Sequence, residues 1–262
     1  MRDWLTARPI AHRGLHDARA GVIENTTSAF HAAVSGGYGI ECDLQISADG
    51  EAMVHHDDAL GRLTDGQGRL DAMPAAALKR VAFKTGADRM LTLGELCDLD
   101  AGRATLVIEL KSRFTGDLRL PARAAAVLAG YAGPAALMSF DPELIAAVRN
   151  AAPALARGLV GMRRDPSDPT EKTSGLRYAR HSLAARPQFL AYRVADLTTA
   201  PPLIARHLLR MPLLTWTVRT VEDRTRAARF ADQSDFPAAF CQAATSSAIN
   251  RYSCVARLTP VS

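Results

Sequence analysis

Ionisable residues alternate with apolar ones in two short segments of this sequence. Glu41 and Asp43 lie two residues apart in the first segment, and Glu109 and Lys111 lie two residues apart in the second. If both segments are strands, the two side chains of each pair point to the same face. Three carboxylates gathered in this way would bind a hard cation such as magnesium or calcium, which prefers oxygen ligands, rather than zinc.

Two histidines could reach the same place. His12 ends an apolar run near the N-terminus, and His56 ends another that follows the acidic pair. If the chain turns back around Asp49, His56 lies opposite Cys42 and beside the acidic pair. Only one of His55 and His56 can enter the site, because neighbouring residues of a strand point in opposite directions.

Arg13 and Lys111 would bring positive charge to the same site. Burying so many charged groups is costly unless they are paired, and a cation between the carboxylates would pair them. Both basic side chains would then be free to hold phosphate oxygens. Three simpler interpretations stay open: Lys111 as the salt-bridge partner of Glu109, the acidic pair as a solvated strand face, and His12 as an ordinary hydrogen-bonded residue.

Such a site needs strands that end at one common edge. Apolar runs rich in Val, Ile and Leu alternate with Ala-rich segments of helical period, which is typical of βα units around a parallel sheet. In α/β barrels of this kind the reacting groups lie at the C-terminal ends of the strands. We predict seven strands, one fewer than a closed barrel needs, at residues 10–13, 39–45, 105–111, 136–140, 157–161, 189–194 and 213–218.

Capping residues mark where the helices between these strands begin. Asn25 can cap the helix 26–35, and Thr92 with Glu95 forms the pattern of a capping box. Asp141 before a proline and Thr220 before two acidic residues begin two more helices. Each helix therefore follows its strand closely, as a barrel requires.

The segment after the acidic pair departs from the βα pattern. Residues 47–50 form a tight-turn sequence, and residues 52–56 are predicted to return as an antiparallel strand. A Gly-rich loop at 64–68 and a short helix at 75–81 follow. We interpret residues of about 46–90 as a small insertion after the second strand, lying over one mouth of the barrel.

Several motifs of the chain resemble those of the glycerophosphodiester phosphodiesterase family. They are Ala11-His12-Arg13-Gly14, Glu24-Asn25-Thr26, Glu41-Cys42-Asp43, Asp49-Gly50, Val54-His55-His56-Asp57, Ile108-Glu109-Leu110-Lys111, Ser139-Phe140-Asp141-Pro142-Glu143 and Trp216-Thr217-Val218. Their order and spacing agree with the family over the first nine-tenths of the chain, which is more specific than any single motif. The resemblance implies a TIM (β/α)8 barrel that carries the insertion.

The resemblance also implies roles for the site residues. His12 and His56 correspond to the acid-base pair, and Arg13 and Lys111 to the phosphate contacts. The ligands of one divalent cation, Mg2+ or Ca2+, correspond to Glu41, Asp43 and Glu109. Trp216 is expected to line the pocket, although a core aromatic at a strand end is an equal alternative. Asp57 is expected to orient His56, and Glu24 or Asn25 to complete the polar site.

The C-terminal region departs from the family. A Gly-Ile-Ile-Thr-Asp-Arg-Pro-like eighth strand is expected there, whereas residues 232–241 contain Pro237, which is awkward in a central strand. The eighth strand is therefore either atypical, within residues 235–241, or missing. If it is missing, we expect stability to suffer before chemistry, because no predicted site residue lies beyond Trp216. We predict a single domain over residues 1–262 with an atypical tail at about 234–262.

Composition indicates which partners and which cellular location to expect. The 262 residues are 48% hydrophobic and 23% charged, with a net charge of +5 spread along the chain, so a nucleic-acid surface is not expected. No apolar run approaches the roughly 20 residues of a membrane span, and the first residues lack a leader pattern. The four widely spaced cysteines suggest free thiols. We expect a cytoplasmic protein without stable membrane insertion, and the sequence does not determine its oligomeric state.

The expected activity is metal-dependent hydrolysis of a small glycerophosphodiester to glycerol 3-phosphate and an alcohol. The family chemistry implies attack by the glycerol 2-hydroxyl, followed by opening of a cyclic phosphate by water, with the two histidines exchanging roles. One alternative is a lysophospholipase D-like or sphingomyelinase D-like activity on lipids, which Leu60, Leu63 and Leu70 leave open. Another is a catalytically idle barrel that binds a phosphorylated metabolite.

Overall fold

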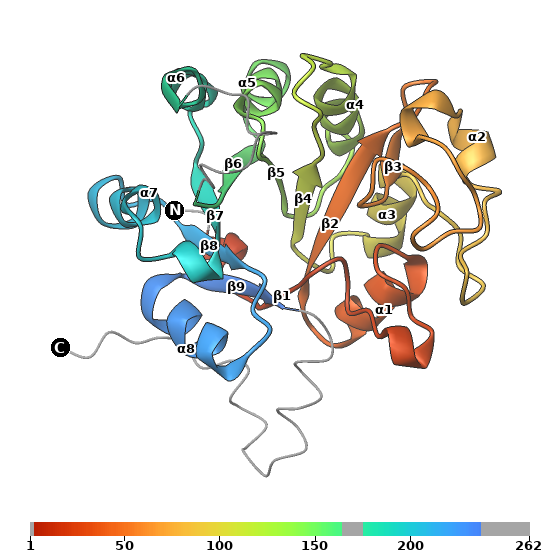
Figure 1. The fold of residues 1–262 in the computed structure, drawn as a ribbon, viewed down its shortest axis with the longest axis horizontal. Helices are drawn as coiled ribbons and strands as arrows, with labels where there is room; N and C mark the ends of the chain where they lie inside the picture. The colour runs from red at the N-terminus through yellow and green to blue at the C-terminus, as the bar shows by residue number, and fades with distance from the viewer. Residues whose placement is uncertain (1–2, 164–174, 237–262) are drawn as a thin grey trace, which may run out of the picture.

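A closed ring of parallel strands forms the centre of the computed structural model, which describes residues 3–163 and 175–236 (Figure 1). Neighbouring strands follow the order β1-β9-β8-β7-β6-β5-β4-β2-β3, and β1 also pairs with β2. Eight strands therefore close the predicted barrel, and β3 lies outside the ring. The strands are β1 Ile10–Ala11, β2 Gly39–Ile46, β3 Ala52–Val54, β4 Leu106–Leu110, β5 Ala135–Ser139, β6 Ala156–Gly161, β7 Phe189–Arg193, β8 Leu213–Trp216 and β9 Gln233–Phe236.

The last strand, β9, closes the barrel, so the alternative in which the eighth strand is missing is wrong. It pairs in parallel with β8, where Ser234 lies opposite Thr215, and with β1, where Asp235 lies opposite Ile10. The strand starts two residues earlier than we expected and ends at Phe236, before the proline that made a strand improbable. Pro237 and residues 244–262 lie outside the described residues.

Helices surround the barrel between successive strands (Figure 1). Three predicted starts are confirmed, because Thr92 and Thr220 each make a capping box and Asp141 accepts a hydrogen bond from the Glu143 backbone. These caps satisfy backbone N–H groups that a helix leaves without partners in its first turn. The helices are α1 Thr27–Ser35, α2 Ala75–Leu78, α3 Leu93–Asp100, α4 Arg119–Leu128, α5 Pro142–Ala151, α6 Gly175–Ala185, α7 Ala200–Leu203 and α8 Val221–Phe230.

Asn25 does not cap α1, contrary to the prediction. The N-cap residue is Thr26, whose side chain makes no capping hydrogen bond. Asn25 instead adopts a positive φ of 57° and is buried. Its amide nitrogen donates to Asp43 Oδ2 at 2.8 Å, and its amide oxygen accepts from the Asp43 backbone nitrogen at 3.2 Å. The side chain that the sequence assigned to a helix end therefore supports an acidic residue of the site.

The alternation of side chains along β2 explains how the barrel carries both a core and a site. Ile40, Cys42 and Leu44 point outward and pack with the surrounding helices in the largest apolar cluster. Glu41 and Asp43, on the other face, point into the barrel. Below them the barrel interior is apolar and includes Leu5 from the 3-10 helix Asp3–Leu5. The acidic pair therefore lies at one end of a packed core rather than in a pore.

The predicted hairpin after β2 is present. β3 runs antiparallel to β2, with Leu44 opposite Val54, and the same register continued would place His56 opposite Cys42, as predicted. The segment between β3 and α3 contains the 3-10 helix Leu70–Ala72 and α2, which pack on a small apolar cluster that includes Met53 and Leu78. This segment has its own small core beside the barrel.

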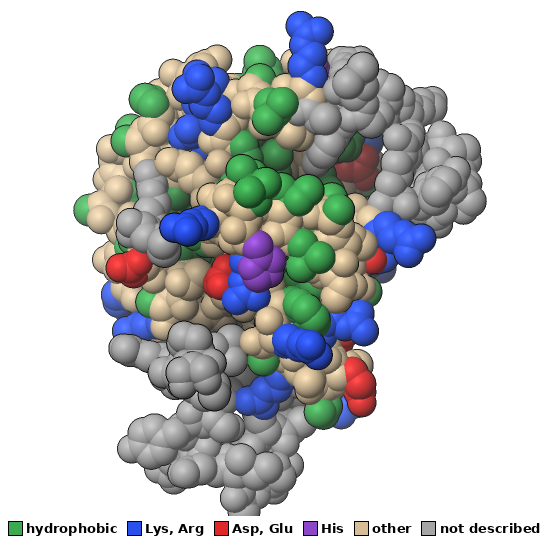
Figure 2. Space-filling model, turned by 90° about the vertical axis from the view of Figure 1, so that its left-hand side faces the viewer, with side chains coloured by type: hydrophobic (Ala, Val, Ile, Leu, Met, Phe, Trp, Pro, Cys, Tyr) green, Lys and Arg blue, Asp and Glu red, His purple; other side chains and the backbone are tan. Residues whose placement is uncertain are grey.

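The outer face that carries α7 exposes apolar side chains. Figure 2 shows this face, which lies on the left in Figure 1, with apolar side chains gathered near its centre. Ile204, Leu208 and Leu209, in and just after the π-helix Ile204–Leu208, are among the exposed residues, and none of them lines the pocket described below. Within the described ranges, no helix has the length and apolar character that crossing a membrane requires.

Candidate active site

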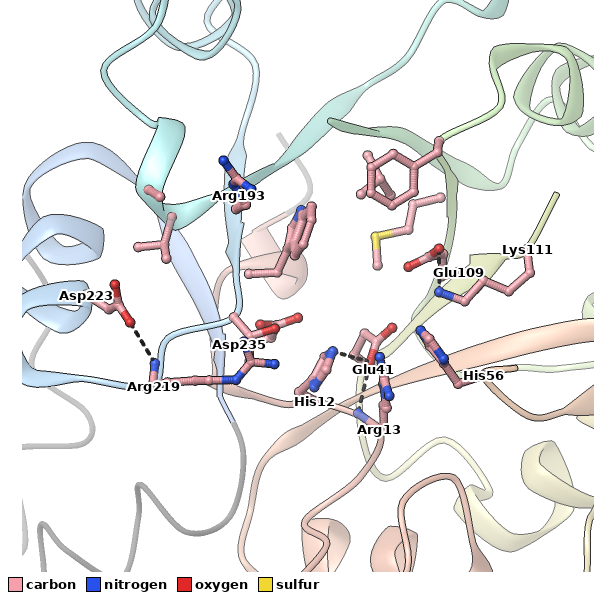
Figure 3. Close-up of a pocket in the computed structure, with 17 residues that line it drawn as sticks. His12, Arg13, Glu41, His56, Glu109, Lys111, Arg193, Arg219, Asp223 and Asp235 are labelled. Atoms are coloured by element: carbon pink, nitrogen blue, oxygen red, sulfur yellow. Dashed lines mark hydrogen bonds and ion pairs between the residues drawn. The ribbon is translucent and has the colours of Figure 1, made fainter. Parts of the chain in front are cut away.

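A pocket of about 490 Å³ opens where the barrel strands end (Figure 3). Seven of the eight predicted site residues line it, and the eighth, Asp43, is buried against two of them. The eight residues come from five strands or the loops that follow them, so the fold brings together positions more than 200 residues apart. The seven lining residues are His12, Arg13, Glu41, His56, Glu109, Lys111 and Trp216.

Strand register places the three predicted carboxylates together. Asp43 on β2 lies opposite Glu109 on β4, and Glu41 is two residues before Asp43 on the same face. One carboxylate oxygen from each residue lies within 4.8 Å of the others. All three residues are buried, which excludes the solvated strand face that the sequence left open for the acidic pair.

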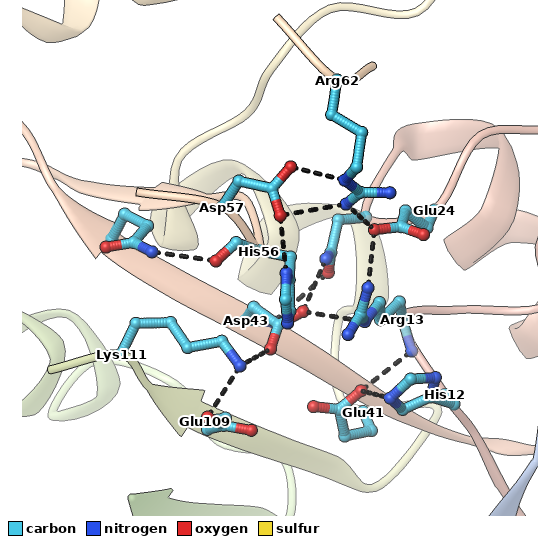
Figure 4. A network of polar contacts seen from close by, with 12 residues as sticks. His12, Arg13, Glu24, Glu41, Asp43, His56, Asp57, Arg62, Glu109 and Lys111 are labelled. Carbon is cyan, nitrogen blue, oxygen red and sulfur yellow. Dashed lines mark hydrogen bonds and ion pairs between the residues drawn. The ribbon is translucent and has the colours of Figure 1, made fainter. Parts of the chain in front are cut away.

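Two basic side chains approach these carboxylates. Lys111 Nζ lies 2.8 Å from Asp43 Oδ1 and 2.7 Å from Glu109 Oε1, while Arg13 Nε lies 3.3 Å from Asp43 Oδ2 (Figure 4). Burial alone would raise the pKa of Asp43, but Lys111 and Arg13 hold it below its ordinary value. The contact between Lys111 and Glu109 is the salt bridge that the sequence left open as an alternative, and it is present.

A tight turn after β1 aims Arg13 into the site. Arg13 has a positive φ of 57°, and its backbone nitrogen donates to Glu41 Oε2 at 2.9 Å. Gly14 follows with a φ of 77°, and a Cβ atom there would lie 2.9 Å from the backbone of Ala29. A side chain at this position would be strained by the φ angle and would also collide with α1. The turn therefore requires glycine directly after the pocket arginine.

His56 is held by its neighbour in the sequence. Its Nδ1 atom lies 2.8 Å from Asp57 Oδ1, and its backbone oxygen accepts a hydrogen bond from Gln45 at 2.9 Å. Burial opposes ionisation of Asp57, but hydrogen bonds from Arg62 and His56 lower its pKa. An ionised carboxylate can only accept, so Nδ1 of His56 is the donor and Nε2 carries the free lone pair. His55 does not line the pocket.

His12 and His56 lie on either side of Glu41 and Arg13 (Figure 3). Its Nε2 atom is 4.0 Å from Glu41 Oε2, and its backbone nitrogen donates to the carbonyl oxygen of Phe236 at 3.1 Å. Burial, with the nearby charge of Arg13, lowers the pKa of His12 to about 3. The closing strand β9 therefore contacts a predicted site residue through its backbone.

Asp235, on the closing strand β9, is a pocket residue that the sequence analysis missed. It is buried, its Oδ1 atom has no hydrogen-bond partner among the described residues, and it forms a second possible ligand group with His12 and Glu41. A sequence signal for Asp235 exists. The family's eighth strand is expected to end in Thr-Asp-Arg-Pro, and the Asp and Pro of Ser234-Asp235-Phe236-Pro237 have the same spacing. The missing Gly-Ile-Ile run before it concealed the match.

The opposite wall of the pocket is largely apolar and aromatic. Trp216 and Phe140 meet edge to face, with ring centroids 5.6 Å apart, and Met138 and Val160 line the same cavity. Arg193 and Arg219 also line the cavity, with Arg219 beside Asp235 and Asp223 (Figure 3). The cavity thus offers charged groups to an anion on one side and apolar surface on the other.

The buried carboxyl groups outnumber the cations that face them. Glu41, Asp43, Glu109 and Asp235 are buried, whereas three cations act on them: Lys111 and Arg13 beside Asp43, and Arg219 together with Arg13 near Asp235. Burial and the neighbouring carboxylates raise the pKa of Glu41 well above its ordinary value, and burial also raises the pKa of Glu109 and Asp235. Oxygen donors that lack counter-charge in this way fit a divalent cation.

Comparison with known proteins gives one consistent result. The model of the glycerophosphoryl diester phosphodiesterase family matches residues 12–233. A glycerophosphodiester phosphodiesterase of Caldanaerobacter subterraneus is 37% identical over 39% of this chain and 44% of its own length. Glycerophosphodiester phosphodiesterase 1 of Bos taurus is 48% identical over 26% of this chain and 20% of its own length. The matches thus span less than half of either relative.

Solved structures show the same fold. An Oleispira antarctica phosphodiesterase in complex with the product sn-glycerol-3-phosphate has a TM-score of 0.75 at 21% identity, over 92% of this chain and 97% of that one. A glycerophosphodiester phosphodiesterase of Thermotoga maritima has a TM-score of 0.68 at 20% identity, over 90% and 98%. At these identities the likeness establishes the barrel architecture.

Proposed function

Because the chain belongs to the glycerophosphoryl diester phosphodiesterase family, we propose that it hydrolyses glycerophosphodiesters to glycerol 3-phosphate and an alcohol. The observation that carries this function is the meeting of two histidines, a buried carboxylate group and two basic side chains in one pocket. These are the groups that a phosphodiester needs for charge neutralisation and proton transfer. The product named in the Oleispira structure belongs to the same chemistry.

Glu41, Asp43 and Glu109 would hold one divalent cation. Their oxygen donors and their excess of negative charge fit Mg2+ or Ca2+. When bound, the cation supplies Lewis acidity that withdraws charge from the phosphoryl oxygens. Lys111 Nζ pairs with Asp43 and Glu109 in this structure, and with a cation on these carboxylates its ammonium group would be free to hold the phosphate.

Arg13 and Lys111 would orient the phosphate, and His12 and His56 would move the protons. In the first step, one imidazole accepts the proton of the glycerol 2-hydroxyl as its oxygen attacks phosphorus, and the other gives a proton to the departing alcohol oxygen. In the second step, water opens the cyclic phosphate and the two imidazoles exchange roles. Asp57 would keep Nδ1 of His56 protonated, so that Nε2 is the atom that exchanges the proton. Trp216 and Phe140 would exclude water from the alcohol side.

Release of glycerol 3-phosphate from glycerophosphocholine, with Mg2+, Ca2+ or a chelator added, tests this function. We expect turnover with at least one of the cations and none with the chelator. A folded protein that binds the cation without releasing glycerol 3-phosphate would contradict the proposal. Turnover of a lysolipid alone would assign the lipid-directed activity that the apolar wall of the pocket also suits. The cytoplasmic location remains a prediction.

A further inference from the structure

Arg62, in the segment that follows β3, contacts two acidic residues beside the pocket without lining it (Figure 4). Its Nε atom donates to Asp57 Oδ2 at 2.6 Å, and one terminal nitrogen donates to Glu24 Oε1 at 2.6 Å. The same terminal nitrogen lies 3.2 Å from Asp57 Oδ1. One guanidinium group therefore joins the segment after β3 to the segment before α1.

Each of these two carboxylates holds one residue of the pocket. Asp57 Oδ1 lies 2.8 Å from Nδ1 of His56, and Glu24 Oε1 accepts a hydrogen bond from Arg13 at 2.8 Å. The polar contacts thus run without interruption from His56 through Asp57, Arg62 and Glu24 to Arg13. The first and last members of this chain line the pocket.

The geometry at Arg62 restricts both ends of this chain. Asp57 presents both oxygens to one planar guanidinium, which fixes the plane of its carboxylate and hence the oxygen that faces the imidazole. Hydrogen bonding by Arg62 and the charge of Arg13 lower the pKa of Glu24, although burial opposes them. Glu24 therefore stays ionised, and its Oε1 atom holds two guanidinium groups at fixed positions.

We propose that Arg62 is a positioning residue that fixes the ring orientation and tautomer of His56 and the direction of the Arg13 side chain. Its kinetic consequence rests on the proposed function, whereas its structural consequence does not. Without Arg62, the Asp57 carboxylate can rotate away from His56, and Glu24 loses one of its two cationic partners. In the wild-type protein, the segment after β3 would thus act on the reaction through Arg62 without contacting substrate.

The sequence offers a matched control in the same segment. Arg69 also bridges two carboxylates, Asp58 at 2.7 Å and Asp71 at 2.8 Å, but neither of these residues lines the pocket. We expect Arg62→Ala to lower kcat about 10–100-fold, the loss usual when a residue that orients a site group is removed. Arg69→Ala should stay within about twofold of wild type, since surface salt bridges contribute little. Both variants should unfold at similar temperatures.

A conservative variant separates positioning from charge alone. Arg62→Lys keeps the positive charge but cannot hold two carboxylates in one plane, so kcat should recover only in part. KM should change less than kcat in both Arg62 variants, because the substrate contacts remain. Equal kcat in Arg62→Ala and Arg69→Ala would overturn the kinetic role.

Nitrogen-15 NMR of the histidine rings gives a readout that needs no turnover. At a pH where the imidazole is neutral, wild-type His56 should show the Nδ1-protonated tautomer, and Arg62→Ala should show a mixture of tautomers. His56→Gln assigns the signal. An unchanged tautomer in Arg62→Ala would overturn the role toward His56. If the protein hydrolyses no glycerophosphodiester, the proposed function fails, and the tautomer alone then decides whether Arg62 positions His56.

Discussion

The backbone nitrogen of His12 donates to the carbonyl oxygen of Phe236 at 3.1 Å. This bond joins the first residue after β1 to the last residue of β9. The strand that closes the barrel therefore also fixes the start of the turn that carries His12 and Arg13. Barrel closure and site geometry depend on the same contact, so damage to β9 should affect both stability and activity.

Phe236→Ala tests that dependence. The Phe236 side chain is buried and meets Tyr38 edge to face, with centroids 5.4 Å apart. We expect the free energy of unfolding to fall by about 3–5 kcal/mol, the usual cost of truncating a buried phenylalanine, and kcat to fall with it. Urea denaturation measures the first effect. Phe114→Ala, at an exposed position, should change stability by less than about 0.5 kcal/mol, and equal effects in the two variants would contradict this account.

The sequence was sufficient for the parts of the site that depend on strand alternation. Glu41, Asp43 and Glu109 could be placed together because a period of two puts each on the inward face, and the observed register of Asp43 opposite Glu109 agrees. The hairpin turn near Asp49 likewise placed His56 correctly. These positions were predictable because strand alternation and turn geometry are set by residues that are close together in the sequence.

Side-chain partners set by tertiary structure could not be predicted in this way. Asn25 has the residue type of a helix cap, yet the approach of β2 gives it Asp43 as a partner. Arg62 contacts Glu24 across a sequence separation of 38 residues, which no spacing rule reveals. Asp235 was missed because its strand lacks the apolar run that marks the other strands, and its neighbours β1 and β8 complete the pairing instead.

His56→Ala tests the proton-transfer role. We expect kcat to fall by about 100-fold or more, since a positioned acid or base contributes roughly 10²–10⁴-fold. The cation dissociation constant should remain close to the wild-type value, because His56 belongs to neither of the ligand groups found among the described residues. Steady-state kinetics and calorimetric titration measure the two quantities. His31→Ala, at an exposed position on α1, is the control, and an equally active His56→Ala variant would exclude the role.

Glu109→Gln tests the cation site. The amide keeps the shape of the side chain but removes one negative charge, so cation affinity should fall at least tenfold. Removing a group that only orients a metal ligand usually lowers cation affinity about 10–100-fold, and removing a ligand itself should lower it at least as much. Calorimetric titration with Mg2+ and Ca2+ measures the change. Glu95→Gln, at the surface salt bridge with Lys79, should leave the affinity unaltered, and equal affinities in both variants would remove Glu109 from the site.

Asp196, which contacts the pocket residue Arg193, should contribute to stability in a pH-dependent way. Its Oδ2 atom accepts hydrogen bonds from Arg193 Nε at 2.7 Å and from the Arg163 backbone at 2.9 Å. Burial would raise the pKa of Asp196, but these donors lower it below the ordinary value. The stabilisation is therefore complete above that ordinary value, about 3.9, and is lost as the pH falls through the lower folded-state pKa.

Asp196→Asn should accordingly destabilise the protein by about 1–2 kcal/mol at pH 7, toward the low end for hydrogen bonds to a charged group because Arg193 is partly exposed. The difference from wild type should shrink as the pH is lowered from 5 to below 3, since protonation removes the charge that the variant lacks. Urea denaturation at several pH values measures this trend. Asp98→Asn, at an exposed carboxylate, controls for the general effect of acid on the fold. A difference that stays constant down to the lowest pH would show that shape, rather than ionisation, is what Asp196 contributes.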